Sequence, residues 1–392
     1  MSCTDELIPV QERKQGRLMA QRTKYSMVKD HILNWINDGT VKPGEKIPPE
    51  SELVHSFGVS RHTIRQAVGE LVNEGYLYRE QGSGTYCSHV LPNPIPETIE
   101  RISNGKNIGV ITTYMSDYIF PSIIRGIESH LASKGYTLTL SCTDNDVERE
   151  RQCLEMMIDR QIDGLIVEPT KSSNYNPNIK YYLELEQQHI PYLMINQFYS
   201  QLVPAHLIMD DEKGGFLAAE HLIKLGHERI LGLFKTDDLQ GVHRMSGFIR
   251  AFREYGLPLE PELIVTYTTE DMVPSFYDSI GYFFENAEER PSAVVCYNDQ
   301  LALSVLDQLR KLHLSVPQDI SLVGYDDSIL AVATEVKLTS VLHPKQELGR
   351  AAAEWIIAAV EKQEAPPSHI YEPELIIRNS TAPFNRLESK LG

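Results

Sequence analysis

The sequence predicts an α/β protein with an N-terminal winged helix-turn-helix and a larger two-lobed domain that contains parallel sheets. Residues 23–90 combine short helical patterns, a glycine-containing turn and a hairpin pattern, which is typical of a winged helix-turn-helix. Residues 91–106 are proline-rich and lack periodicity, so they predict a linker. Residues 107–385 alternate near-continuous apolar strands with amphipathic helices, as buried parallel sheets do. Residues 1–22 have no periodic pattern, and we expect a disordered tail there.

The size and composition indicate a globular protein with several domains. The chain has 392 residues, too many for one ordinary core, and 42% of them are hydrophobic. Apolar runs are only as long as strands, and the N-terminus has acidic residues but no apolar segment, so we expect neither a membrane span nor a secretory signal. The five cysteines are scattered without CxxC spacing. This pattern predicts a cytoplasmic location and no metal site.

The net charge of −17 is distributed unevenly along the chain. Residues 1–90 contain 11 basic and 11 acidic residues, so the whole negative balance lies in the remainder. A neutral module whose basic residues gather on one face can still bind phosphates, because the local field matters more than the total charge. The overall acidity therefore does not exclude nucleic acid as a partner of the N-terminal region.

The first two helices of the N-terminal region are bounded by glycine and proline. The first lies within residues 25–39 and ends at Gly39. A turn and a short extended segment at 46–47 follow. The second helix begins at Pro49, whose fixed φ suits a helix start, and Gly58 ends it.

The third helix has an unusual polar face. It begins after Ser60, which is placed to cap it, and it ends near Gly75. Arg61, His62 and Arg65 gather at its N-terminal end, which is already positive because of the helix dipole. The opposite face carries an apolar stripe at helical spacing, formed by Ile64, Ala67, Val68 and Leu71. Three nitrogen-bearing side chains at this end do little for stability and indicate a ligand.

These polar residues are candidates for reading DNA. The second helix of a helix-turn-helix enters the major groove with its N-terminal residues at the base edges. Arg61 and Arg65 lie one turn apart, and Arg matches the guanine edge, while His62 is also able to bond base edges. We expect Thr63 to bond backbone or phosphate, and Lys24, just before the first helix, to meet a phosphate. The alternative, a solvated polar face, is disfavoured by the surrounding helix, cap and hairpin.

A hairpin follows the third helix and forms the predicted wing. Its extended segments are 76–79 and 85–88, and Gly82 and Gly84 supply the turn. Glycines in such a turn also allow the backbone to approach a phosphate or the minor groove closely. Gln81 at the tip is a candidate for groove contact, although any tight hairpin needs glycine, so this signal alone is weak.

Residues of this region resemble the DNA-binding domain of GntR-type bacterial repressors. The resemblance spans about 65 residues and rests on "VSRHTIRQA", the L-x-x-x-G at the helix end, the wing "GSGT" and the E-x-x-L of helix two. The resemblance implies that Glu50, the first residue of the E-x-x-L motif, belongs to the DNA-binding residues. It implies that double-stranded operator DNA is the partner.

The larger domain begins with the strand "NIGVITT", and strands and helices then alternate. The strands are predicted at 107–113, 136–142, 163–169, 190–196, 206–211, 229–234, 292–299 and 320–327. The helices are predicted at 121–134, 147–160, 178–188, 212–225, 242–255, 300–312 and 346–361. Because about 285 residues exceed one sheet layer, we expect two lobes.

Polar and aromatic side chains follow several of these strands. In open α/β sheets, ligands bind outside the carboxyl ends of strands. Arg244 near the start of its helix belongs with these strand-end residues, which are Tyr114, Asp117, Tyr118, Phe120, Glu168, Asn196, Asn298 and Asp326. Sugars need this mixture, because polar groups bind vicinal hydroxyls and aromatic faces cover C–H surface. Carboxylates after strands also cap helices, and Asp211 and Asp327 are candidates for that role alone.

The larger domain resembles the sugar-sensing region of LacI/GalR repressors, which is itself similar to periplasmic sugar-binding proteins. The matching stretches include "DGLIVEP", "HLIKLGHERI", "CYNDQLAL" and "ISLVGYDD". The resemblance implies a two-lobed periplasmic-binding-protein-like fold. It places Glu168, Asn196, Arg244, Asn298 and Asp326 on effector-contacting positions, with His343 in the "SVLHP" crossover as a further one. The loop "TYMSDYIFP" departs from the better-known relatives, so its contacts are less defined.

The combination of a GntR-type head and a LacI/GalR-type body is similar to that of arabinose-responsive repressors of Gram-positive bacteria. This resemblance implies a homodimer on a pseudo-palindromic operator, released by a monosaccharide, with L-arabinose the expected effector. It implies no cofactor. An enzyme that metabolises sugar is disfavoured because GxGxxG, GxxxxGK[ST], GxSxG and HExxH motifs are absent. A sugar receptor whose head binds protein remains an alternative.

Overall fold

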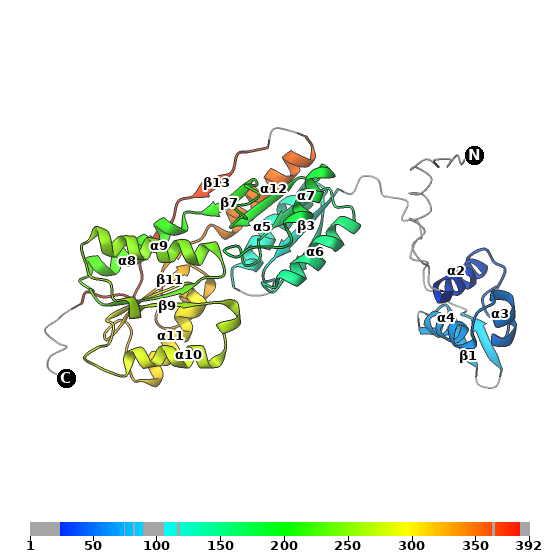
Figure 1. Cartoon of the computed structure of the whole chain (residues 1–392), viewed down its shortest axis with the longest axis horizontal. Helices are drawn as coiled ribbons and strands as arrows, with labels where there is room; N and C mark the ends of the chain where they lie inside the picture. Colours follow the sequence, from blue (N-terminus) through cyan, green and yellow to red (C-terminus); the bar gives the residue numbers. More distant parts are fainter. Residues whose placement is uncertain are drawn as a thin grey trace, which may run out of the picture. The chain divides into compact units, whose positions relative to one another are not determined.

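The computed structural model describes residues 24–73, 75–80, 83–88, 106–115, 118–362 and 365–384. The chain divides into two compact units, the first within residues 1–104 and the second within 105–392 (Figure 1). The predicted tail, 1–22, and all but the last residue of the predicted linker, 91–106, lie outside the described residues.

The first unit is a winged helix-turn-helix, as the sequence predicts. Its described residues form three helices and a two-stranded antiparallel sheet, α2 (Lys24–Asn37), α3 (Glu50–Phe57), α4 (Arg61–Asn73), β1 (Leu77–Glu80) and β2 (Gly84–Cys87). Gly58 ends α3 in the left-handed conformation at φ 61°, which glycine adopts without strain. Lys46 forms a bridge to Tyr86, which attaches the segment before α3 to the hairpin.

The core of this unit is formed by the apolar faces of the helices and strands. The predicted stripe of α4 is fully buried, since Ile64, Ala67, Val68 and Leu71 are at most 1% exposed. These side chains pack against Val28 and Ile32 of α2, Leu53 of α3 and Leu77 of β1. Burial of α4 on one side fixes its opposite side toward solvent.

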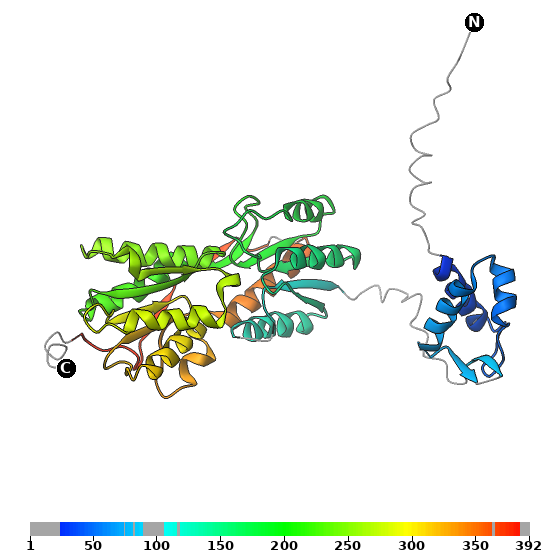
Figure 2. The same cartoon turned by 60° about the horizontal axis from the view of Figure 1, so that its bottom comes forward.

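The second unit contains two six-stranded sheets, one in each lobe (Figures 1 and 2). The first sheet has the order β13-β7-β6-β5-β3-β4, and all its pairs are parallel. Its strands are β3 (Asn107–Thr112), β4 (Thr137–Cys142), β5 (Gly164–Val167), β6 (Tyr192–Asn196), β7 (His206–Met209) and β13 (His369–Tyr371). Its helices are α5 (Phe120–Ser133), α6 (Val147–Asp159), α7 (Ile179–Gln187) and α12 (Lys345–Val360). We call this part the first lobe.

The second lobe has the sheet order β14-β12-β11-β10-β8-β9, in which only the β12–β14 pair is antiparallel. Its strands are β8 (Ile230–Lys235), β9 (Ile264–Tyr267), β10 (Ala293–Cys296), β11 (Ser321–Asp326), β12 (Thr339–Leu342) and β14 (Glu374–Ile376). Its helices are α8 (Asp211–Lys224), α9 (Leu239–Glu254), α10 (Pro274–Gly281) and α11 (Asp299–Lys311).

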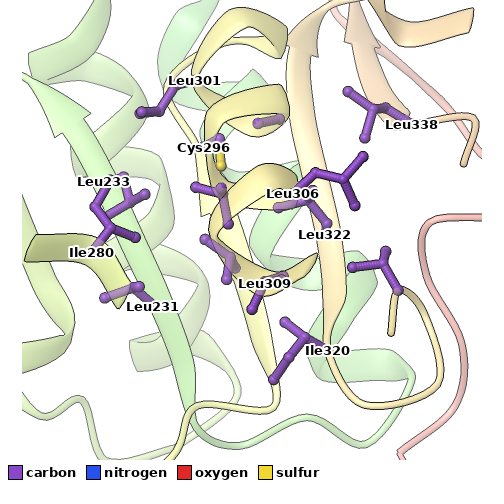
Figure 3. Packing of buried hydrophobic residues seen from close by; sticks show 14 of the residues in the cluster. Leu231, Leu233, Ile280, Cys296, Leu301, Leu306, Leu309, Ile320, Leu322 and Leu338 are labelled. Atoms are coloured by element: carbon purple, nitrogen blue, oxygen red, sulfur yellow. The ribbon is translucent and has the colours of Figure 1, made fainter. Parts of the chain in front are cut away.

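Helices cover both faces of each sheet. In the second lobe, Leu231 and Leu233 of β8 face α10 and α11, whereas Ile230 and Phe234 face α8 and α9. Figure 3 shows the first of these layers, with leucines of α11 packed over β8 and β11. Burial on both faces explains why these strands are continuously apolar rather than alternating.

The chain passes between the lobes three times. The crossings are at Asp210, between β7 and α8, at His343–Pro344, between β12 and α12, and at Glu372–Pro373, between β13 and β14. Each lobe is therefore assembled from separate parts of the sequence. Three adjacent crossings allow the lobes to move as rigid bodies about a common hinge.

In the described part of the second unit, five strands and α-helices were not predicted from the sequence, namely β9, α10, β12, β13 and β14. The missed strands have only three or four residues, and most of them lie toward sheet edges, where exposure interrupts the apolar pattern. In the described parts of the chain, no helix has the length and apolar character needed to cross a membrane.

Candidate functional site

The polar face of α4 is exposed and capped as the sequence predicts. The Thr63 backbone N–H donates to Ser60 Oγ at 3.2 Å, and the two side-chain hydroxyls lie 2.8 Å apart. Arg61, His62 and Arg65 are exposed on the first turns of the helix. The cap fixes the helix start, so these three side chains project from a defined position.

Glu50 of α3 holds the two arginines together. Arg65 Nε donates to Glu50 Oε2 at 2.9 Å, and Arg61 Nε lies 3.4 Å from the same oxygen. The arginine side chains are 68% and 61% exposed, so these ion pairs add little to stability. Each of these bonds uses Nε, so Glu50 does not engage the Nη atoms of the two arginines.

Only some of the other residues predicted to bind DNA belong to the described part of the chain. Lys24 is the first residue of α2, and Gly84 begins β2 with φ 138°, a conformation that favours glycine. Gln81 and Gly82 lie outside the described residues, as does Asp117 of the larger domain.

A cavity of about 200 Å³ lies between the two lobes of the second unit. Seven of the predicted residues line it, namely Tyr114, Tyr118, Phe120, Glu168, Arg244, Asn298 and Asp326. Sites for drug-sized ligands are larger, about 300–1,000 Å³, so this cavity suits a ligand the size of a monosaccharide.

Arg244 is the central cation of the cavity. Its Nε donates to Asp211 Oδ1 at 2.8 Å, and Nη1 donates to the Tyr297 carbonyl at 2.7 Å. Nη2 lies 3.4 Å from Asp326 Oδ1, and the guanidinium stacks on the Tyr325 ring at 3.6 Å. Burial raises the pKa of Asp211 to about 6, although Arg244 opposes this effect. Packing and pairing thus hold Arg244 rigid before any ligand arrives.

Glu168 is oriented by residues behind it. Its carboxylate accepts from the Thr113 backbone N–H at 3.0 Å and from Asn196 Nδ2 at 2.7 Å. His343 Nε2 lies 3.1 Å from Asn196 Oδ1. Asn196 and His343 are buried but are not among the residues that line the cavity, so the structure places them as supports of Glu168. Burial lowers the pKa of His343 to about 3, so its ring is neutral.

Tyr118 connects the lobes across the cavity. It follows β3 of the first lobe with φ 65°, a conformation unusual for a tyrosine. Its hydroxyl donates to Asp326 Oδ2 at 2.6 Å or to the Tyr325 carbonyl at 2.8 Å, and it accepts from the Asp299 N–H at 3.1 Å. All three partners belong to the second lobe.

Sequence reasoning missed the second cation of the cavity, Lys235. Lys235 Nζ lies 3.0 Å from Asp238 Oδ2 and 3.0 Å from Asp237 Oδ1, and Tyr297 donates to Asp238 at 2.9 Å. Lys235 is the last residue of β8, and its place at the end of an apolar strand could have identified it as a site residue. Other missed lining residues are Thr113, Ile119, Asn145, Gln197, Gln240, Tyr267, Met272 and Gln300.

Two helix-cap interpretations are wrong. Asp210, not Asp211, caps α8 by accepting from the Lys213 N–H at 2.9 Å, whereas Asp211 pairs with Arg244. Asp327 pairs with Arg378 at 2.6 Å. Asn298 does cap α11, accepting from the Leu301 N–H at 2.9 Å, and it also lines the cavity.

The cavity combines paired charges with aromatic rings. Arg244 and Lys235 are each paired with two carboxylates, while Tyr114, Phe120 and Tyr297 supply ring surface. Such a lining offers donors and acceptors to hydroxyl groups and aromatic surface to C–H faces. No group of three or more His, Cys, Asp or Glu side chains suited to a metal occurs in the described ranges.

Comparison with known proteins gives matches over both units. Residues 24–87 match "Bacterial regulatory proteins, gntR family", and residues 219–381 match "Periplasmic binding protein-like domain". The arabinose metabolism transcriptional repressor of Halalkalibacterium halodurans is 51% identical over 368 residues, which cover 92% of this chain and 97% of that protein. The protein of the same name from Geobacillus stearothermophilus is 51% identical over 361 residues, covering 91% and 97%.

Solved structures show the same fold for the larger unit. Transcription regulator CcpA of Lactococcus lactis aligns with a TM-score of 0.62 at 22% identity, covering 71% of this chain and 99% of that one. A LacI family transcriptional regulator from Enterococcus faecium, solved with bound ribose, aligns with a TM-score of 0.61 at 25% identity, covering 71% and 100%.

Proposed function

This chain belongs to the family of arabinose metabolism transcriptional repressors, and on that premise we propose that it is released from operator DNA by L-arabinose. It is a DNA-binding repressor of sugar-utilisation genes, with a GntR-type head and a periplasmic-binding-protein-like effector domain. The observation that carries the proposal is the cavity of about 200 Å³ between the two lobes, lined by paired charges and aromatic rings.

In the head, α4 enters the major groove of the operator. Arg61, His62 and Arg65 address base edges, and Glu50 keeps the two guanidiniums side by side until DNA competes for them. Thr63 bonds the DNA backbone. Outside the helix, Lys24 meets a phosphate, and the wing residues Gln81, Gly82 and Gly84 approach the groove.

In the effector domain, the sugar lies between Glu168 of the first lobe and Arg244, Asn298 and Asp326 of the second. Tyr114, Tyr118 and Phe120 cover its C–H surface, and Asp117 contributes from the same loop. Asn196 and His343 act through Glu168. A ligand that contacts both lobes favours the closed arrangement, and this arrangement positions the two heads poorly for the operator.

The energetic demand on this coupling is modest. A tenfold loss of operator affinity corresponds to about 1.4 kcal/mol and a hundredfold loss to about 2.7 kcal/mol, which lie in the usual range of allosteric coupling. Reciprocity requires that operator DNA weakens sugar binding by the same factor.

The functional unit is a homodimer on a pseudo-palindromic operator in the cytoplasm. Two heads then reach two half-sites related by the same two-fold symmetry.

A thermal-shift panel of pentoses and hexoses, combined with operator retardation, tests the proposal. L-arabinose is expected to raise the melting temperature most, because it binds the folded state alone, and to release the operator in the same concentration range. If the protein retards no duplex DNA but binds the sugar, the head binds a protein partner instead. If every sugar leaves both measurements unchanged, the assignment of the cavity is wrong.

A further inference from the structure

The loop that follows β5 contacts the opposite lobe through three consecutive residues, Lys171, Ser172 and Ser173, which we call the bridging loop. Ser173 Oγ donates to the Thr236 carbonyl at 2.6 Å. The Leu239 N–H donates to Ser172 Oγ at 2.9 Å, and Lys171 forms an ion pair with Glu270. Thr236, Leu239 and Glu270 all belong to the second lobe.

The bridging loop lies beside the cavity without lining it. The Lys171 N–H donates to Asn145 Oδ1 at 3.0 Å, and Asn145 Nδ2 donates to Thr269 Oγ1 of the second lobe at 2.6 Å. Asn145 lines the cavity, whereas none of the three bridging-loop residues does. The inter-lobe contacts of the bridging loop therefore join it to Thr236, Leu239 and Glu270, none of which lines the cavity.

We propose that the bridging loop sets the sugar concentration at which the repressor leaves its operator, by stabilising the closed arrangement without touching the sugar. This inference rests on the proposed function and deepens it. Bonds between lobes that do not involve ligand raise the fraction of closed protein before sugar arrives. Because the apparent dissociation constant is the intrinsic constant divided by the competent fraction, removing these bonds weakens binding of every sugar by one common factor.

The bond of Ser173 gives the cleanest test, because the change to alanine removes one hydroxyl. If the Ser173 bond contributes the net free energy typical of a hydrogen bond, the dissociation constant for L-arabinose is expected to rise about 2- to 12-fold in Ser173→Ala. The matched control is Ser279→Ala, since Ser279 Oγ donates to the Phe276 carbonyl at 2.7 Å within the second lobe. For the ion pair, Lys171→Ala is matched by Lys224→Ala, since Lys224 pairs with Glu220 within α8 at 2.9 Å.

The experiment measures calorimetric binding of L-arabinose, and of a second pentose that binds more weakly, to the full-length protein and the four variants. Ser173→Ala and Lys171→Ala are expected to weaken both sugars by the same factor, and the two controls to leave both unchanged. The sugar concentration for half-release of operator should rise in parallel, while operator affinity without sugar is kept or increased.

Three results separate the possibilities. Unchanged affinities in Ser173→Ala and Lys171→Ala overturn the role of the bridging loop. A change in the ratio between the two sugars also overturns it, because that result means that the loop acts on sugar contacts. Failure of wild-type protein to bind any pentose overturns the proposed function instead.

Discussion

Arg244 and Asp211 form a buried ion pair at 2.8 Å, in which both side chains are at most 3% exposed. The pair links α9 to α8 beneath the cavity, and Asp326 and the Tyr325 ring complete the surroundings of the guanidinium. Removing one partner of such a pair leaves an uncompensated buried charge, which costs far more than the net value of the pair.

Arg244→Met is therefore expected to lower the free energy of unfolding by about 3–5 kcal/mol and to abolish sugar binding. Urea denaturation and calorimetry measure the two effects. Arg310→Met is the control, because Arg310 is half exposed and its pairs with Asp307 and Glu335 are worth about 0–1 kcal/mol. A variant of Arg244 as stable as the wild type would contradict the interpretation of a charge held by burial.

Asp299 makes stability depend on pH. Burial raises its pKa to about 7, while hydrogen bonds from Ser340 and Ser328 oppose that rise. The folded state then retains a proton that the unfolded state releases near pH 4, so this contribution to stability is present below about pH 4 and is lost as pH rises to about 7.

Asp299→Asn removes this titration and keeps a similar shape. The free energy of unfolding of the variant is expected to fall less between pH 5 and pH 8 than that of the wild type. Urea denaturation at several pH values provides the comparison. His343 has the opposite effect, because its pKa in the folded state is about 3. Below about pH 6.5 the unfolded state binds a proton that the folded state does not, so stability falls as the pH falls. Identical slopes for variant and wild type would show that Asp299 is ionised throughout.

Tyr118→Phe removes a hydroxyl that bonds the second lobe at Asp326, at the Tyr325 carbonyl and at the Asp299 N–H. Sugar affinity is expected to fall about 10-fold or more, because hydrogen bonds to charged groups are worth about 1.5–3 kcal/mol. Calorimetry measures the change, and Tyr282→Phe, at a position 70% exposed, is the control. Equal affinities in Tyr118→Phe and wild type would mean that the lobes close without this contact.

Arg61→Ala is expected to weaken operator binding by about 1–3 kcal/mol per half-site and to leave sugar affinity unchanged. Operator retardation and calorimetry on the same preparation give both values. Arg310→Ala, which changes a second-lobe arginine, should retain operator binding. Intact retardation by the Arg61 variant would show that α4 does not read the bases.

Much of the fold follows from local patterns. The apolar stripe of α4 and the glycines that bound the head helices predict the winged helix, because each signal lies within a few residues of its effect. The doubly covered strands are equally clear. The crossings at Asp210 and Glu372–Pro373 are not predictable from local patterns. The short strands beside them depend on pairing with partners far along the sequence.

The cavity, too, was predictable from the sequence only in part. Glu168, Arg244 and Asp326 were identified because strand ends and a family resemblance pointed to them. Lys235 and Asp238 were missed, since a lysine that ends an apolar strand normally reaches solvent, and only the packing of β8 against α9 encloses it. Asn196 and His343 illustrate another limit, because sequence does not distinguish a group that touches ligand from one that orients its neighbour.

The three crossings also constrain how the protein is made. The first lobe begins at β3 but needs α12 and β13, which lie after nearly all of the second lobe in the chain, and β14 completes the second lobe later still. Until synthesis is almost complete, a nascent chain on the ribosome therefore exposes the unpaired edge of β7 and the face of the first-lobe sheet that α12 later buries. The head, by contrast, has its whole core available after the first ninety residues, so during translation the DNA-binding module matures well before the part that controls it.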